Sequence, residues 1–165
     1  MRAVLSLGSN LGDREQTIRD AVADIRRLPD VAVVAASSLV ETPAVKPHGV
    51  DHEAPAYLNA AVIVTTDLAP ETLLAELNRI ELEHHRVREE RWGDRTLDID
   101  IITIDDLRQE TATLTLPHPR AAERNFVLVP WLEIEPDAVL PGIGRVDTLL
   151  PGAPDVRRYP AEDLS

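Results

Sequence analysis

The order of strand-like and helix-like patterns along the chain constrains the fold more than any other feature of the sequence. Two segments, about 13–28 and about 70–84, repeat apolar residues at three- and four-residue spacing, which is typical of a helix with one buried face. Apolar runs bounded by turn residues indicate strands over residues 2–8, 31–40, 57–66 and 97–104. The resulting order predicts a ferredoxin-like β-α-β-β-α-β sandwich of the α+β class, with helices packed on an antiparallel sheet.

The other segments carry weaker signals of regular structure. Prolines and a glycine in residues 43–56 predict a long irregular loop, and the arginine-rich residues 85–96 predict a second loop before the last strand. A helix is expected over residues 121–135, with Pro130 near a bend or a new start. After Pro136 we expect a C-terminal extension of coil with short elements.

The last predicted strand contains two carboxylates. Asp98 and Asp100 alternate with apolar residues, so an extended backbone points both carboxylates to one face and the aliphatic side chains to the other. Adjacent carboxylates repel each other unless a cation lies between them. So few oxygen ligands suit Mg²⁺, which keeps several waters and binds phosphates. Guanidinium groups, the common partners of phosphate, lie just upstream at Arg86, Arg88, Arg91 and Arg95. The segment therefore predicts a metal–polyphosphate site.

A purely structural interpretation of this segment is also open. Asp-x-Asp on a strand can be a solvated face, and arginines separated by Glu89, Glu90 and Asp94 can form a salt-bridged surface. Trp92 beside Gly93 can close over a ligand or pack against the domain. The apolar side of the strand and the adjacent arginines add weight to the metal interpretation.

Three further positions also have two interpretations. Tyr57 and Asn59 share one face of a strand, where an amide beside an aromatic ring suits a flat heterocycle, although an ordinary strand start looks the same. His118 lies between prolines, and a histidine in a loop is more often structural or exposed than catalytic. Residues 8–13 connect a strand to a helix and could hold a phosphate. They lack a P-loop ending, so a turn that caps the helix is favoured.

Composition argues against several classes of protein. The formal net charge of −12 argues against a nucleic-acid binder, although Mg²⁺ and a local arginine cluster still permit a nucleotide substrate. No apolar stretch is long enough for a transmembrane helix, so no membrane association is expected. The apolar stretch at the N-terminus is too short for a signal peptide, and the sequence has 0 cysteines for disulfides. Both features favour a cytoplasmic location. We expect one domain over residues 1–165, and a monomer.

Together these motifs resemble the 6-hydroxymethyl-7,8-dihydropterin pyrophosphokinase family of folate biosynthesis. The most specific part of the resemblance is RVREERWGDRTLDIDI (86–101) combined with LTLPHPRAAERNFVLVP (114–130). The other matching stretches, in the family's order, are LSLGSNLGDR (5–14), ETP (41–43), YLNAAV (57–62) and RIELE (79–83). The resemblance implies transfer of diphosphate from ATP to the hydroxymethyl group of 6-hydroxymethyl-7,8-dihydropterin, with release of AMP.

The resemblance also implies roles for individual residues. Asp98 and Asp100 look like the ligands of two Mg²⁺ ions that bridge the ATP phosphates. The residues that look catalytic, the first three of them on a lid over both substrates, are Arg86, Arg88, Trp92 and Arg95. The pterin-binding positions are Thr42, Val45, Tyr57, Asn59 and Phe126. The ATP-binding positions are Asn78, Arg88, Arg95, Ile101, Thr115, His118 and Arg124. Glu81 matches a helix position near the site.

Two other functions stay open at this point. Asp-x-Asp also suits other Mg²⁺-dependent phosphoryl-transfer enzymes, such as nucleases, against which the net charge argues. A non-catalytic ferredoxin-like binding module is the second alternative, but it would not require the carboxylates, the arginines and His118 to meet in one cleft. The chain departs from the family in a short lid with Glu89 in place of a frequent lysine, and in a long 44–56 loop.

Overall fold

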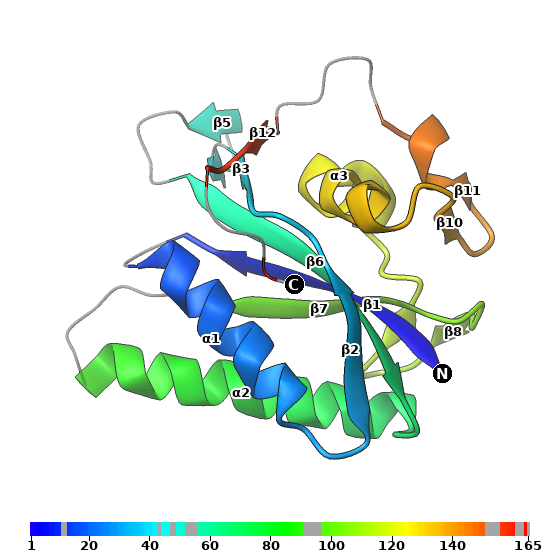
Figure 1. The fold of residues 1–165 in the computed structure, drawn as a ribbon. Coiled ribbons are helices and arrows are strands. Elements are labelled where there is room, and N and C mark those ends of the chain that lie inside the picture. The colour runs from blue at the N-terminus through cyan, green and yellow to red at the C-terminus, as the bar shows by residue number, and fades with distance from the viewer. Residues whose placement is uncertain are drawn as a thin grey trace.

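An antiparallel sheet with helices on both faces organises the computed structural model (Figure 1). The strands run in the order β12-β3-β6-β1-β7, and β2 also pairs with β6. These strands are β1 (Arg2–Ser9), β2 (Val31–Ala36), β3 (Val40–Thr42), β6 (Tyr57–Thr66), β7 (Asp98–Ile104) and β12 (Arg157–Arg158). The α-helices are α1 (Arg14–Arg26), α2 (Pro70–Glu90) and α3 (Asn125–Ile134). The prediction of a mixed α and β structure built on an antiparallel sheet is confirmed.

The structure describes most, but not all, of the chain. The described residues are 1–10, 13–42, 44–46, 49–51, 56–90, 97–150, 156–160 and 164. Only the backbone is described for residues 44–46, 49–51 and 86–90. None of the helices in these ranges is long and apolar enough to cross a membrane.

Short elements decorate the sheet. Small hairpins within the described residues pair β4 (Ala44–Lys46) with β5 (Gly49–Asp51), β8 (Gln109–Glu110) with β9 (Thr115–Leu116), and β10 (Val139–Leu140) with β11 (Gly144–Arg145). The short 3₁₀ helices are η1 (Ala121–Glu123) and η2 (Val146–Thr148). The second of these lies in the C-terminal part, where the sequence predicted only short elements.

Each face of the sheet buries its own apolar cluster. Leu58, Ala60 and Val62 of β6 pack in the cluster that includes α1 and α2. The alternate residues Ala61 and Ile63 pack in the cluster that includes α3. Because side chains alternate along a strand, a strand covered on both faces needs a continuous apolar run. This explains the run in β6 and places Asn59, two positions before Ala61, on the α3 face.

The predicted strand 31–40 is wrong as a single element, because β2 and β3 are separate strands that both pair with β6. Between them, the Ser37 hydroxyl accepts the N–H of Ala61 at 2.9 Å. The Ser38 backbone N–H and hydroxyl donate to Glu133 of α3 at 2.8 and 2.6 Å. Serine side chains compete with the backbone for hydrogen bonds, so they interrupt the ladder here.

Two predicted loops contain regular structure. The predicted irregular loop 43–56 contains the β4–β5 hairpin. The expected arginine loop 85–96 is also corrected, because α2 continues to Glu90 and the backbone of residues 86–90 is helical. The leucine-, glutamate- and arginine-rich sequence of this helix has high helix propensity and no glycine or proline after Pro70, so nothing local stops it earlier.

The predicted helix 121–135 begins later than expected. η1 covers residues 121–123, Arg124 is extended (φ −109°, ψ 99°), and α3 starts at Asn125. Pro130 lies inside α3 rather than at its start. The extended Arg124 therefore separates the two helical segments, and this break sets the direction of the Arg124 side chain.

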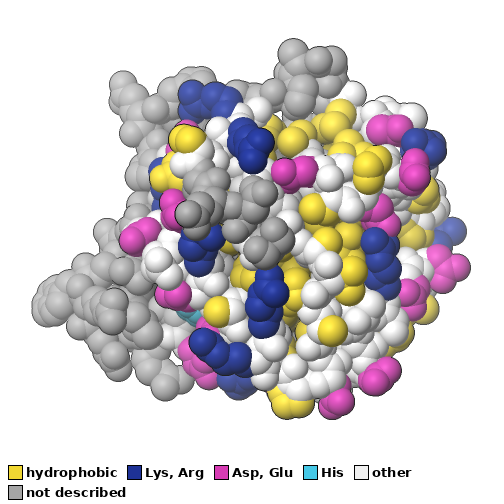
Figure 2. Space-filling view, viewed as in Figure 1, with side chains coloured by type: hydrophobic (Ala, Val, Ile, Leu, Met, Phe, Trp, Pro, Cys, Tyr) yellow, Lys and Arg dark blue, Asp and Glu magenta, His cyan; other side chains and the backbone are white. Residues whose placement is uncertain are grey.

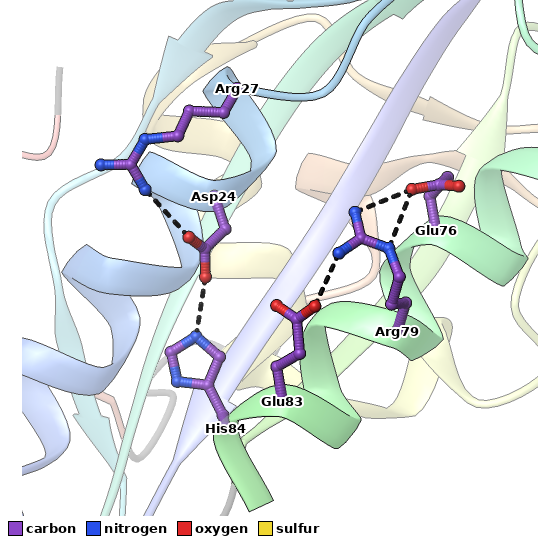
Figure 3. A network of polar contacts seen from close by, with 6 residues as sticks. All are labelled: Asp24, Arg27, Glu76, Arg79, Glu83 and His84. Carbon is purple, nitrogen blue, oxygen red and sulfur yellow. Dashed lines mark hydrogen bonds and ion pairs between the residues drawn. The ribbon is translucent and has the colours of Figure 1, made fainter. Parts of the chain in front are cut away.

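Polar contacts on the helix surfaces tie α1 to α2 (Figure 3). The His84 Nε2 atom lies 3.0 Å from Asp24 Oδ2, and Arg27 pairs with the other oxygen of Asp24 at 3.1 Å. Arg79 bridges Glu76 and Glu83 along α2. The Arg79 pairs are exposed, so solvent screens them and they contribute little to stability. Acidic and basic side chains are interspersed among the described residues of the face in Figure 2.

Candidate active site

The two aspartates of β7 lie at the edge of the sheet beside β1, which pairs Gly8 with Asp98 and Ser6 with Asp100. Asp98 is the more exposed of the two aspartates but is not fully accessible, Asp100 is half-buried, and Ile99 between them is buried. The alternation predicted from the sequence is therefore present, with both carboxylates on one face. Both aspartates line one cavity of about 560 Å³, the larger cavity of the site.

The carboxylates make this end of the sheet electronegative. Partial burial and then the charge of Asp100 raise the pKa of Asp98, while His85 and Arg124 oppose the rise. Glu81 of α2 accepts the backbone N–H of Ile99 at 3.2 Å. Its burial, with smaller contributions from both aspartates, raises the pKa of Glu81 to about 7 despite that hydrogen bond. Each carboxylate here would gain from a nearby cation.

The donor set fits a divalent cation that takes most of its ligands from elsewhere. Asp98 and Asp100 offer hard oxygen ligands on one face. Within the described ranges, no group of three or more histidine, aspartate or glutamate side chains is arranged to enclose a metal ion. Two carboxylates with open surroundings suit Mg²⁺, because this ion keeps waters and binds substrate phosphates.

His118 and Arg124 approach the same oxygen of Asp100. The distances to Asp100 Oδ2 are 4.0 Å from His118 Nε2 and 3.7 Å from Arg124 Nη1. The backbone N–H of Arg120 donates to His118 Nδ1 at 3.1 Å, so in the neutral ring the proton is on Nε2 and faces Asp100. Burial lowers the pKa of His118, with Asp100 opposing and the two arginines reinforcing the shift. Beside Asp100 Oδ2, His118 is thus a neutral hydrogen-bond donor and Arg124 is a cation.

The backbone explains why a loop histidine reaches this position. The His118 N–H donates to the Ile102 carbonyl at 2.9 Å, which docks residues 117–119 against β7. Arg124 extends from the break between η1 and α3, and its guanidinium lies 5.6 Å from the centre of the Phe126 ring. His118 is therefore half-buried and held against β7, unlike an exposed loop histidine.

The larger cavity gathers most of the predicted pterin positions. Thr42, Tyr57, Asn59 and Phe126 all line it. Asn59 is buried, and its Nδ2 lies 3.4 Å from the Thr42 hydroxyl, so its amide faces the cavity with a fixed neighbour. The side chain of Val45, the fifth predicted position, lies outside the described residues.

A smaller cavity of about 320 Å³ gathers predicted ATP positions on the other side of Asp100. It lies between α2 and residues 111–119, beside β7, which is the last strand of the sheet. The predicted ATP positions that line it are Asn78, Ile101, Thr115 and His118. Arg124 lines the larger cavity instead. Because Asp100 lines both cavities, they meet at this carboxylate.

Four predicted catalytic positions lie in the segment around residue 90. Arg86 and Arg88 belong to the last turns of α2 rather than to a loop, and their side chains are outside the described set. Trp92 and Arg95 also lie outside the described residues. The placement of Arg86, Arg88 and Trp92 on a lid stays a prediction, as does the catalytic role of Arg95.

Sequence reasoning missed several residues of the larger cavity. Gly8 belongs to β1, and a Cβ atom there would lie 2.8 Å from Asn59 Oδ1. The turn beside it was expected to cap the first helix, and Asp13 does so by accepting the N–H of Gln16 at 3.1 Å. The other missed lining residues are Ser6, Arg120, Glu123, Asn125 and Val156. All of these except Val156 lie in stretches that carry the family resemblance, but neither spacing nor the resemblance indicated a role for them.

We expect Glu81→Gln to remove a pH-dependent loss of stability from the metal-free protein. The pKa of Glu81 is about 7 against an ordinary 4.5, so the folded state holds the proton more tightly than the unfolded state. Stability therefore falls as the pH rises from about 4.5 through about 7, and it stays lower above that value. Thermal melting in a chelating buffer between about pH 5 and pH 8 should show this decline relative to the variant. Parallel curves would contradict it. Glu83→Gln, on the surface of the same helix, is the control.

Comparison with known proteins identifies the family of the chain. The family described as 7,8-dihydro-6-hydroxymethylpterin-pyrophosphokinase (HPPK) matches residues 4–136. A 2-amino-4-hydroxy-6-hydroxymethyldihydropteridine pyrophosphokinase of Methylorubrum extorquens is 43% identical over 141 residues, which are 86% of this chain and 87% of that protein. The protein of the same name in Bacillus subtilis is 46% identical over 132 residues, 80% of this chain and 77% of its own length.

A solved structure resembles the fold. An HPPK-DHPS triple mutant of Plasmodium falciparum superposes with a TM-score of 0.69 at 15% sequence identity. The match covers 90% of this chain and 42% of that longer chain, so the present chain spans less than half of it. At this identity the likeness concerns the fold alone.

Proposed function

The chain belongs to the 7,8-dihydro-6-hydroxymethylpterin-pyrophosphokinase family, and from this premise we propose that it transfers diphosphate from ATP to 6-hydroxymethyl-7,8-dihydropterin, releasing AMP, in folate biosynthesis. The observation that carries the proposal is the meeting of two cavities at Asp100. A pterin in the larger cavity and ATP in the smaller one would bring the hydroxymethyl group and the phosphates together beside both aspartates.

The larger cavity suits a flat heterocycle with polar edges. Tyr57 and Phe126 supply aromatic surface for stacking, and the Asn59 amide offers one donor and one acceptor to ring atoms. The Thr42 hydroxyl holds the amide in place. We assign these residues and Val45 to pterin binding.

The smaller cavity suits the nucleotide. Asn78, Ile101 and Thr115 would contact the nucleoside, while His118 and Arg124 would contact phosphate oxygens where the cavities meet. The neutral Nε2–H of His118 can donate a hydrogen bond, and Arg124 supplies a charge that does not depend on pH near neutrality. Both stand too far from Asp100 for a hydrogen bond, so neither donor is taken up by that carboxylate.

Asp98 and Asp100 would hold two Mg²⁺ ions, which bind together with ATP. When bound, Mg²⁺ would neutralise phosphate charge and orient the triphosphate for in-line displacement. The carboxylates keep the metal beside the junction of the cavities, and Glu81 keeps the backbone of Ile99 between them in place. The role of Glu81 is thus positional.

The transfer needs positioning more than covalent help from the protein. The pterin hydroxyl oxygen forms a bond to the β-phosphorus as the bond from that phosphorus to the bridging oxygen of AMP breaks, and the hydroxyl proton is released to solvent. The pterin slot and the phosphate contacts hold the two atoms in line, which can supply several kcal/mol of the barrier reduction. We assign no general base. Arg86, Arg88 and Trp92 would close over both substrates and exclude water, and Arg95 would contact phosphate, assignments that rest on the family motif.

We also propose a ferredoxin-like core, one domain over residues 1–165, a monomer, and a cytoplasmic location. The strand order and the helices α1 and α2 on one face support the core arrangement. The net charge of −12 supports free nucleotide and pterin as partners rather than nucleic acid. The lack of cysteine supports the location.

The direct test is product analysis with ATP, Mg²⁺ and 6-hydroxymethyl-7,8-dihydropterin. We expect AMP and the pterin diphosphate in equal amounts, with no AMP when either the pterin or Mg²⁺ is omitted. Formation of ADP, or pterin-independent release of nucleotide fragments, would contradict the proposal. Calorimetry with a non-hydrolysable ATP analogue and 6-hydroxymethylpterin measures each substrate's affinity separately.

A further inference from the structure

The C-terminal tail returns to the pterin end of the sheet, although the family match ends at residue 136. Figure 1 shows β12 beside β3, and the register places Arg157 opposite Glu41. The N–H of Tyr159 then donates to the Leu39 carbonyl at 2.9 Å. The edge of β3 that faces away from β6 is therefore covered by the chain's own tail.

A polar cluster fastens this contact. The Glu41 carboxylate receives Arg157 on one oxygen at 3.1 Å and Arg14 of α1 on the other at 3.0 Å. Arg14 also donates to the carbonyl of Ala56, the residue before β6, at 2.7 Å. Its guanidinium lies 5.8 Å from the centre of the Tyr159 ring. Since Glu41 and Arg14 are both 23% exposed, this pair is better shielded than the Arg79 pairs of Figure 3, whereas Arg157 is exposed.

The tail is fastened again farther along the chain. Leu164 is buried in the apolar cluster of α1 and α2, and its carbonyl accepts Arg26 at 3.1 Å. Both ends of the segment are thus anchored, one at β3 and one at α1.

The start of this segment reaches the site itself. Val156, the residue before β12, is half-buried and lines the larger cavity with Thr42, Tyr57 and Asn59. β3, which β12 covers, places Val40 opposite Asn59 and Thr42 opposite Tyr57. One short segment therefore contributes cavity surface and supports the strand that carries Thr42.

We propose that residues 156–159 are part of the pterin-binding site: Val156 forms an apolar wall, and the β12–β3 pairing positions Thr42 and, through it, the Asn59 amide. The proposal deepens the pterin assignment and rests on the proposed function. It extends the pterin site beyond the segment that matches the family, so differences in this tail would alter pterin affinity without altering the metal or nucleotide residues.

The test uses the full chain and measures separately the contribution of the Val156 side chain and that of the β12–β3 pairing. Val156→Ala removes apolar surface, and Val139→Ala, at an exposed residue of the C-terminal part that does not line the cavity, is its control. Tyr159→Pro removes the N–H that donates to Leu39, and Tyr159→Ala, which keeps the N–H and loses the ring, is its control. Steady-state kinetics give KM for each substrate and kcat, and amide hydrogen exchange over residues 39–42 reports the pairing.

We expect Val156→Ala to raise the pterin KM roughly three- to tenfold, with the ATP KM and kcat unchanged. Tyr159→Pro should raise the pterin KM and speed exchange over residues 39–42, both more than Tyr159→Ala does. Should Tyr159→Pro fail to fold, Val156→Ala decides. If the enzyme is active and the pterin KM is the same in Val156→Ala and Val139→Ala, this proposal is overturned while the proposed function stands. Absence of pterin-dependent AMP from the unaltered protein would overturn the proposed function as well.

Discussion

Replacing Asp100 by asparagine is expected to lower kcat about 1000-fold or more, since losing a charged metal ligand costs roughly 4 kcal/mol in the transition state. Asp100 is the one aspartate that lines both cavities, and it faces His118 and Arg124. Asparagine keeps the shape and removes the charge. Its half-exposed position and the relief of repulsion with Asp98 should leave the fold intact. Kinetics over a Mg²⁺ titration, with thermal melting, measure both effects.

The matched control is Asp106→Asn, at an exposed aspartate just past the same strand. It should leave kcat and the Mg²⁺ dependence unchanged. If Asp100→Asn retained near-normal turnover at saturating Mg²⁺, the metal assignment would be wrong. A variant that lost activity because it no longer melted cooperatively would instead show a structural role for Asp100.

Asn59→Ala is expected to weaken pterin binding far more than binding of the ATP analogue. A buried hydrogen-bonding group left without its partner costs about 1–3 kcal/mol, which corresponds to roughly a five- to 150-fold rise in Kd. Asn59 is buried in the cavity wall beside Thr42, away from the residues that line the smaller cavity. Calorimetry with 6-hydroxymethylpterin, at saturating ATP analogue, measures the change. Equal weakening of both ligands would indicate that Asn59 only supports the fold.

Two companion variants sharpen this experiment. Gly8→Ala places a methyl group 2.8 Å from Asn59 Oδ1, so it should move the amide and weaken pterin binding in the same direction. Asn78→Ala, which alters the smaller cavity, should weaken the ATP analogue and spare the pterin. The opposite selectivity of Asn59 and Asn78 would distinguish two sites from one.

Local periodicity in the amino-acid sequence accounts for much of the framework. The alternation around Asp98 and Asp100 placed both carboxylates on one strand face, and helical spacing predicted the two long helices. These properties depend on the backbone geometry of residues close in sequence. The same reasoning failed where distant groups intervened. Ser37 and Ser38 split a valine-rich strand because their partners, Ala61 and Glu133, come from β6 and α3.

The candidate site divides in the same way. Sequence alone determined which residue types were available: a carboxylate pair, an amide beside an aromatic ring, and a histidine between prolines. Only the tertiary structure decided that His118 docks on β7 and approaches Asp100, that Gly8 must be small for Asn59 to fit, and that Val156 of the C-terminal tail lines the cavity. Residue spacing encodes a face of a strand or helix, whereas a cavity is made by the packing of elements far apart in the chain, whose distances no local pattern records.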